Sequence, residues 1–133
     1  MIRDGERILV SGGHDSVKEE TFYRPLGGGI EFGEFGHDAI RRELSEELAV
    51  EVASTRYLAT LENVFAYEGK PWHELVRVYE VELAGPLPAT PFTVLDSDGE
   101  VVWMPLSAFE GEGAPPLYPD GLLQLLTAAP TRR

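Results

Sequence analysis

The sequence predicts one α/β (α+β) domain that spans residues 1–133. A chain of 133 residues has about the size of a single domain, and 43% of its residues are hydrophobic, which is enough for one packed core. Segments rich in β-branched and aromatic residues lie on both sides of a segment with helical periodicity. Neither an internal repeat nor an interdomain linker interrupts them. The combination of one helical segment with strand-like segments before and after it therefore indicates the α/β (α+β) class.

Short strands are expected near the start of the chain. The apolar run at residues 8–10 predicts the second half of a strand or hairpin. Few residues precede this run, so either the first strand is short or the chain starts further upstream. Residues 11–20 are polar and rich in glycine, which predicts a mobile loop, and residues 21–24 are β-prone until Pro25 ends them.

Residues 37–48 are predicted to form a helix. Ile40, Leu44 and Leu48 recur every fourth residue and form an apolar stripe along it. Gly36 is available as a weak N-cap immediately before the first helical residue. The helix therefore directly follows a glycine-rich segment.

The remainder of the chain alternates between strands and turns. We expect one long or broken strand at 51–67, a turn at 68–71 and a second strand at 75–83. A short strand follows at 101–104, and an amphipathic helix with four leucines is expected from about residue 120 to 128.

The charge of the chain excludes one class of partner. Twenty-three acidic residues against 11 basic ones give a formal net charge of −12. A protein that binds duplex nucleic acid through its phosphates needs a basic surface, so we expect no such partner. An anionic small molecule remains compatible with this charge, because a bound divalent cation reverses the local field.

Two absences narrow the possibilities further. The chain has no cysteine, which excludes disulfides, thiolate nucleophiles and zinc–thiolate sites. No window approaches the roughly 18 uninterrupted apolar residues of a membrane helix, and the N-terminus has no apolar signal region. We therefore expect a cytoplasmic protein without a membrane partner.

Three carboxylates share one region of the predicted helix. Glu43 and Glu47 lie about 40° apart around the helix axis and roughly 6 Å apart along it, with Glu46 to the other side. This pattern is also typical of a solvated helix face. Like charges at this spacing are mildly unfavourable unless a cation such as Mg²⁺ or Mn²⁺ neutralises them. The glycine-rich loop directly before the helix favours the cation, because it lets bound phosphates approach.

Six residues recur at a distinctive spacing: Gly28, Glu34, Arg42, Glu43, Glu46 and Glu47. This spacing resembles the signature box of the Nudix hydrolases, the MutT-like family. The box would cover residues 28–50. If each residue type occurs at roughly 7%, six matches arise by chance about once in ten million starting positions.

The resemblance implies a Nudix-type α/β/α sandwich with a mixed β-sheet. It also implies hydrolysis of a nucleoside diphosphate linked to another group, by attack of water on phosphorus, with Mg²⁺ or Mn²⁺ as the cofactor. Glu43 and Glu47 would be the principal metal ligands. Glu46 would be a further ligand or the group that deprotonates the water, so Glu46 and Glu47 are the catalytic candidates inside the box. Dimers are common in the family, and a homodimer is compatible with this chain.

Other box residues would have structural roles. Arg42 would hold the loop and helix carboxylates together, with Glu31 and Glu34 close to it in the loop. One position departs from the family pattern, because Ala49 stands where glycine usually ends the helix in a left-handed conformation. Alanine adopts that conformation only at a cost of about 1 kcal/mol. We therefore expect a slightly different helix exit and a retained metal site.

The general base has several candidates outside the box. Family members often take this group from elsewhere in the chain. Glu74 lies on the predicted second strand, Glu100 precedes the late strand, and Asp96 or Asp98 lies in the turn before it. Each is equally typical of a solvated turn or strand edge.

Five residues are candidates for substrate binding. Tyr23 and Arg24 enter the glycine-rich loop, where they could hold a base or a phosphate. Phe65, Tyr67 and Trp72 flank the turn between the long strands and are candidates to stack on a base. Packing in the core or in the hairpin is the alternative for each aromatic ring. The sequence leaves open which nucleotide-type diphosphate binds.

The alternative function is a catalytically silent Nudix-fold module that binds nucleotides. Loss of the box carboxylates would indicate such a module. Glu43, Glu46 and Glu47 are all present, which favours the hydrolase.

Overall fold

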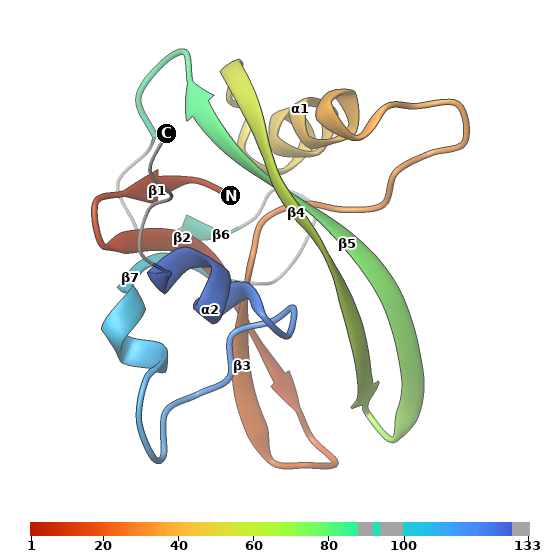
Figure 1. Ribbon diagram of the computed structural model, residues 1–133, viewed down its shortest axis with the longest axis vertical. Coiled ribbons are helices and arrows are strands. Elements are labelled where there is room, and N and C mark those ends of the chain that lie inside the picture. Colours follow the sequence, from red (N-terminus) through yellow and green to blue (C-terminus); the bar gives the residue numbers. More distant parts are fainter. Residues whose placement is uncertain (88–91, 94–99, 129–133) are drawn as a thin grey trace.

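Long strands dominate the computed structural model, which describes residues 1–87, 92–93 and 100–128 (Figure 1). Within these residues, no helix is long and apolar enough to cross a membrane. The elements are β1 (Arg3–Asp4), β2 (Arg7–Asp15), β3 (Glu20–Pro25), α1 (Gly36–Leu48), β4 (Val52–Tyr67), β5 (Lys70–Leu83), β6 (Phe92–Thr93), β7 (Glu100–Pro105), the 3-10 helix η1 (Leu106–Phe109) and α2 (Leu122–Thr127).

Strand β2 lies at the centre of a five-stranded sheet. β7 pairs with one edge of β2, β1 and β3 share the other edge, and β6 adds to β7. β4 and β5 form a separate two-stranded sheet, seen as two long curved ribbons in Figure 1. All strand pairs among the described residues are antiparallel, and the parallel component there is one isolated bridge between Tyr23 and Leu117.

The N-terminal backbone connects the two sheets. The N–H of Val81 in β5 donates to the carbonyl of Met1 at 3.0 Å, and the N–H of Leu9 in β2 donates to the carbonyl of Ile2 at 2.9 Å. These two bonds let the separate sheets act as one central layer.

Helices cover both sides of this layer. Leu9 of β2 packs in one buried cluster with Leu44 and Leu48 of α1. Its neighbour Ile8 packs in a second buried cluster with Leu122 of α2. Because successive side chains of a strand point to opposite faces, α1 and α2 lie on opposite sides of β2, in the predicted α/β/α arrangement.

The predicted loop at residues 11–20 is wrong over its first half. β2 continues through Asp15, and only the short turn before β3 is irregular. The cross-strand partner of Gly13 is Phe22, whose ring lies 2.6 Å from where a Cβ on Gly13 would be. Aromatic rings from β3 therefore cover glycines that look like loop residues in the sequence.

Helix α1 begins and ends close to its predicted bounds. It starts at Gly36, with Phe35 rather than Gly36 at the N-cap. Ala49 itself adopts the left-handed conformation, with φ 57° and ψ 38°, and its N–H donates to the carbonyl of Ser45 at 3.0 Å. The expected change of the helix exit is therefore not found, and the alanine takes the conformation usual for glycine.

The β4–β5 hairpin is longer than predicted. β5 begins at Lys70 instead of residue 75, and the turn narrows to Glu68 and Gly69, with φ of 52° and 78°. Two positive φ values at a two-residue turn match the twist of a tight hairpin. β4 is continuous but its register shifts between Val52 and Ser54 and again between Tyr57 and Ala59. Helix α2 is shorter than expected and covers only Leu122–Thr127.

Candidate active site

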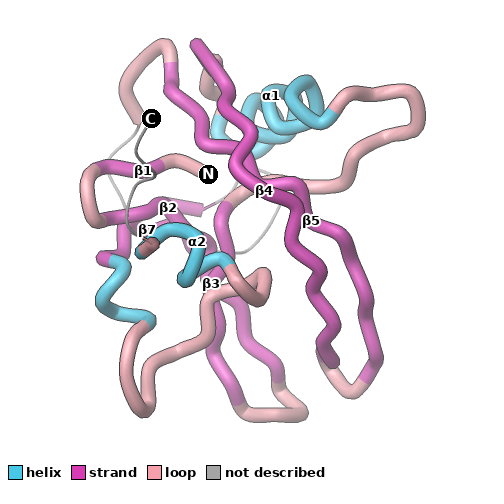
Figure 2. Tube along the Cα trace, viewed as in Figure 1, coloured by secondary structure: helices cyan, strands magenta, loops and turns pink. Residues whose placement is uncertain are grey.

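The glycine-rich loop between β3 and α1 lies directly against the helix. Figure 2 shows this loop extending away from the body of the protein. A Cβ added at Gly28 would overlap sterically with the carboxylate of Glu43, whereas a Cβ at Gly29 would meet nothing within 4 Å. The backbone at Gly28 thus approaches the Glu43 carboxylate more closely than a residue with a side chain could.

The guanidinium of Arg42 joins the loop to the helix. Its Nε and Nη2 donate to the two carboxylate oxygens of Glu34 at 2.8 and 3.0 Å, which forms a bidentate pair. Nη1 donates to Glu43 Oε1 at 2.9 Å and to Glu46 Oε1 at 3.1 Å. Nη2 also donates to the carbonyl of Gly29 at 2.9 Å. One cation therefore fixes three carboxylates and the loop backbone.

This network shifts the pKa of both partners in the bidentate pair. Hydrogen bonds from Arg42, with a further one from the N–H of Glu31 at 3.1 Å, lower the pKa of Glu34 to about 2. Hydrogen bonds to Glu34 and Glu43 raise the pKa of Arg42 above its ordinary value. The carboxylate of Glu31 lies farther away, 3.9 Å from Nε of Arg42. Glu34 and Arg42 therefore both stay charged near neutral pH.

The three box glutamates differ in their surroundings. The side chain of Glu43 is 15% exposed and that of Glu46 is 51% exposed, while Oε1 of Glu47 is buried. In the described part of the chain, no three acidic or histidine side chains converge into a formed metal site. Arg42 instead engages one oxygen each of Glu43 and Glu46. By donor chemistry the set fits a hard divalent cation, since carboxylate oxygens are the ligands that Mg²⁺ and Mn²⁺ prefer.

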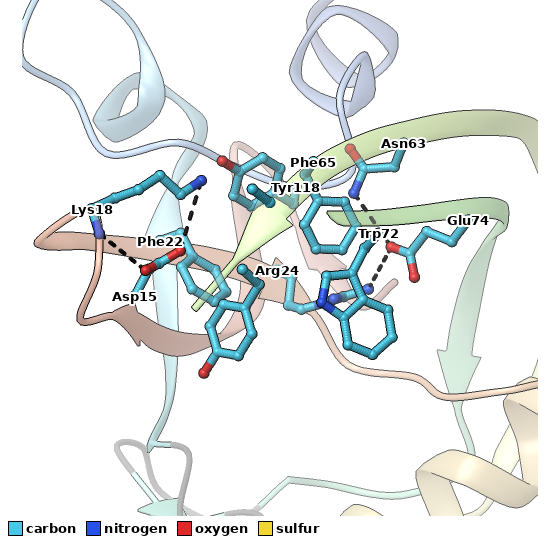
Figure 3. A pocket seen from close by; sticks show the side chains of 11 residues that line it. Asp15, Lys18, Phe22, Arg24, Asn63, Phe65, Trp72, Glu74 and Tyr118 are labelled. Carbon is cyan, nitrogen blue, oxygen red and sulfur yellow. Dashed lines mark hydrogen bonds and ion pairs between the residues drawn. The ribbon is translucent and has the colours of Figure 1, made fainter. Parts of the chain in front are cut away.

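A separate pocket of about 270 Å³ lies between the β2–β3 and β4–β5 hairpins (Figure 3). Phe65 stacks on Trp72 with ring centroids 6.4 Å apart and on Tyr118 at 6.0 Å. Phe22 meets Tyr118 edge to face at 5.6 Å. The indole of Trp72 remains 52% exposed. The pocket therefore offers an accessible aromatic face with further rings behind it.

Arg24 and Glu74 stand at one side of this pocket. Nη2 of Arg24 donates to Glu74 Oε1 at 3.4 Å, and Nδ2 of the buried Asn63 donates to the same oxygen at 3.3 Å (Figure 3). Arg24 and Glu74 also line a groove of about 720 Å³ between β5 and the loop residues 27–29. The aromatic pocket and the glycine-rich loop are therefore connected through this ion pair.

The structure does not bring every predicted residue to these two regions. Tyr23 packs edge to face on Phe109 at 5.9 Å and is not among the residues that line the aromatic pocket. Glu100 is exposed at the first position of β7. Asp96 and Asp98 lie outside the described residues.

Sequence reasoning missed several residues of the pocket, among them Phe22, Asn63 and Tyr118. Asn63 alternates with Leu61 and Phe65 along β4, so strand periodicity could have placed it on the inward face. Phe22 was assigned to a strand without a role. Tyr118 lies in a segment rich in proline and glycine that gave no structural signal.

Comparison with known proteins identifies the fold and the family. A model of the NUDIX domain matches residues 1–121. The chain belongs to the Nudix family. The resemblance seen in residues 28–50 is thereby confirmed and extends over most of the chain.

Solved structures agree with the Nudix fold. The MutT NUDIX hydrolase from Burkholderia pseudomallei is 22% identical, with a TM-score of 0.59, and the match covers 80% of this chain and 78% of that protein. The E. coli ORF135 protein is 24% identical, with a TM-score of 0.62, and the match covers 95% and 83% of the two chains. The predicted fold class is confirmed. The protein is a Nudix hydrolase acting on phosphoric anhydride bonds, and the family generally uses divalent metals and nucleotide-type small molecules.

Proposed function

We propose that this Nudix protein is a Mg²⁺- or Mn²⁺-dependent pyrophosphohydrolase that cleaves the diphosphate of a nucleoside diphosphate linked to another group. Glu43, Glu46 and Glu47 would hold the metal. When bound, the metal would neutralise charge on the diphosphate and make a water more nucleophilic. The observation that carries this proposal is the approach of the Gly28 backbone to the Glu43 carboxylate, beside two further carboxylates on the same helix.

The network around Arg42 supports a site that is organised before substrate arrives. Arg42 donates hydrogen bonds to Glu34 in the loop and to Glu43 in the helix. These bonds fix the position of the loop relative to the helix carboxylates. A fixed arrangement reduces the reorganisation needed when charge develops in the transition state. We assign Arg42, Glu34 and Glu31 to this positioning role.

The proton acceptor for the attacking water is proposed to lie in the box. Glu46 and Glu47 belong to the helix that carries the other carboxylates. Glu74 is already paired with Arg24 and Asn63, and Glu100 is exposed at the start of β7. Glu74 and Glu100 remain candidates from the sequence that a substitution series would test in the same assay.

The aromatic pocket is proposed to bind the nucleoside. Phe65 and Trp72 provide a stacking surface, and Arg24 lies between this surface and the loop, where a phosphate would pass. Base–aromatic stacking tolerates any base, because every base has a π-face.

We also propose, from the sequence, a cytoplasmic homodimer that binds no duplex nucleic acid. Light scattering would measure the oligomeric state.

The test is phosphate release, coupled to a phosphatase, over a panel of nucleoside diphosphate derivatives with Mg²⁺ or Mn²⁺. We expect Glu47→Gln to reduce metal-dependent turnover by roughly 10²–10³-fold, the scale of losing one transition-state contact. Glu51→Gln is the matched control, because it makes the same charge change at an exposed residue beyond the helix. Turnover unaffected by Glu47→Gln would contradict the metal assignment. A folded wild type that binds nucleotides but turns over no substrate would instead favour the silent binding module.

A further inference from the structure

The aromatic pocket contains polar groups that differ in whether they are available to a ligand. Asp15 is 1% exposed, and its Oδ1 accepts from the N–H of Val17 at 2.9 Å and of Lys18 at 3.1 Å. Its Oδ2 accepts from the N–H of Glu68 at 3.2 Å. Oδ1 of Asp15 therefore stabilises its own β2–β3 turn, and Oδ2 links that turn to the turn of the β4–β5 hairpin.

Asn63 is similarly occupied. It is 1% exposed, its Nδ2 donates to Glu74 Oε1 at 3.3 Å, and its Oδ1 accepts from the N–H of Asp120 at 3.1 Å. A buried amide is most stable when both its oxygen and its nitrogen are hydrogen-bonded, as they are in Asn63. Asn63 would lose these hydrogen bonds if it rotated toward a ligand. Its contribution is to fix the carboxylate of Glu74.

Glu74 differs, because only one of its oxygens is engaged by the described residues. Arg24 and Asn63 both donate to Oε1, while no donor in the described part of the chain reaches Oε2. The side chain is 35% exposed and lines the pocket beside Trp72 (Figure 3). A carboxylate oxygen with open lone pairs is a strong acceptor and cannot donate.

From this arrangement we infer that Glu74 reads the edge of the bound nucleobase and selects bases with an exocyclic amino group. The inference rests on the proposed function, which places the nucleoside in this pocket. Cytosine and adenine would donate an amino N–H to Oε2. Uracil and hypoxanthine have a keto oxygen at the same ring position, which would face the carboxylate with like partial charge.

The size of the effect follows from the exposure of the site. A charge-assisted hydrogen bond at a partly exposed position corresponds to roughly a tenfold difference in affinity. Stacking on Trp72 would not distinguish the bases, so the discrimination would come from Glu74. Matched pairs that differ at one exocyclic group isolate this contact: CMP against UMP, and AMP against IMP.

Substitution by glutamine gives a distinctive expectation. Arg24 and Asn63 both donate toward the Oε1 position, so a glutamine at residue 74 would place its carbonyl oxygen there. Its NH₂ group would then occupy the Oε2 position and present a donor to the ligand. Glu74→Gln would therefore reverse the preference toward the keto bases, whereas Glu74→Ala would remove the preference without reversing it.

The experiment is isothermal titration calorimetry of the full chain with CMP, UMP, AMP and IMP in the presence of Mg²⁺. We expect wild type to bind CMP and AMP about tenfold more tightly than UMP and IMP. Glu74→Ala should bring each ratio close to one, and Glu74→Gln should bring it below one. Glu62→Gln is the matched control, because Glu62 lies on the same hairpin, contacts His73 at 2.6 Å and does not line the pocket. We expect it to leave the ratios unchanged. Circular dichroism melting would verify that each variant is folded.

Two results would overturn the inference. One is equal affinity of wild type for the members of each matched pair. The other is an equal loss of affinity or turnover for both members in Glu74→Gln, which would indicate a role in catalysis or in structure. Because the readout is nucleotide binding, it does not depend on turnover. Base discrimination without hydrolysis would support the inference and contradict the proposed hydrolase, while metal-dependent hydrolysis without discrimination would do the opposite.

Discussion

The signature box and the aromatic pocket are built in opposite ways. In the box, Arg42 contacts carboxylates and backbone that lie within 13 positions of it along the chain. In the pocket, Phe22 and Phe65 meet Tyr118, so segments from the N-terminal, middle and C-terminal thirds of the chain converge. The box is charged and held by hydrogen bonds, whereas the pocket is held mainly by ring contacts.

This difference suits the box to the reaction and the pocket to the choice of substrate. A charged network with several hydrogen bonds to one guanidinium has few alternative arrangements, which suits a reaction centre. A pocket of stacked rings with one open acceptor tolerates different ligands and distinguishes them by a single contact. We expect changes in the box to alter turnover, and changes in the pocket to alter which substrate binds.

Among changes that keep every carboxylate of the box, the largest expected effect is at the closest backbone approach. Gly28→Ala would introduce a Cβ that overlaps sterically with the Glu43 carboxylate and displaces it. Because a displacement of about 1 Å at a reaction centre can cost roughly 100-fold, we expect turnover to fall by about that factor. Gly29→Ala is the matched control, since a Cβ there meets nothing within 4 Å. Similar turnover of the two variants in the phosphate-release assay would contradict this account.

The Glu34–Arg42 pair gives the box a characteristic pH dependence. The pKa of Glu34 is lowered to about 2 in the folded protein, from 4.5 without these contacts. The unfolded chain therefore binds the proton more tightly, and the stabilising contribution is complete above about pH 4.5 and lost as the pH falls toward 2. Urea unfolding of wild type and Glu34→Gln should show a difference in free energy that is constant near neutral pH. This difference should narrow below pH 4.5, and a difference independent of pH would argue against the ion pair.

A smaller effect is expected from the exposed ring of the pocket. Trp72→Ala removes the most accessible stacking surface, and we expect nucleotide affinity to fall roughly fivefold, near the lower end for base stacking. Turnover at saturating substrate should be retained, since Trp72 is not part of the box. Tyr57→Ala is the control, because this ring is also about half exposed, at 48%, and lies outside the pocket. Equal losses in both variants, measured by calorimetry, would exclude a specific role for Trp72.

The smallest predicted effect concerns stability alone. Ala49 ends α1 with φ 57°, which glycine adopts without strain. Ala49→Gly should raise the free energy of unfolding by about 0.5–1 kcal/mol and leave turnover unchanged. Ala53→Gly in β4 should have the opposite sign, by a similar amount, because Ala53 is not among the residues with positive φ and glycine there only adds freedom to the unfolded chain. Destabilisation by Ala49→Gly in urea unfolding would show that the left-handed conformation is not strained.

The extent of sequence-based prediction varies along the chain for a physical reason. Helix α1 and its carboxylates follow from contacts between residues three to eight positions apart, so periodicity and spacing are sufficient to predict them. Gly12 and Gly13 were predicted as a loop because their strand conformation depends on rings contributed by β3. The sequence of β2 by itself does not indicate that rings from β3 pack over these two glycines.

By itself, the sequence determined the family, the boundaries of α1 and the set of carboxylates in the box. These depend on residue identity at short separations. Only the tertiary structure decided that Glu74 and Asn63 share one hydrogen-bonded group, and that Tyr118 completes the aromatic pocket. Contacts between distant segments depend on strand register and on how the hairpins pack against each other. Those are properties of the whole fold, so local sequence patterns do not contain them.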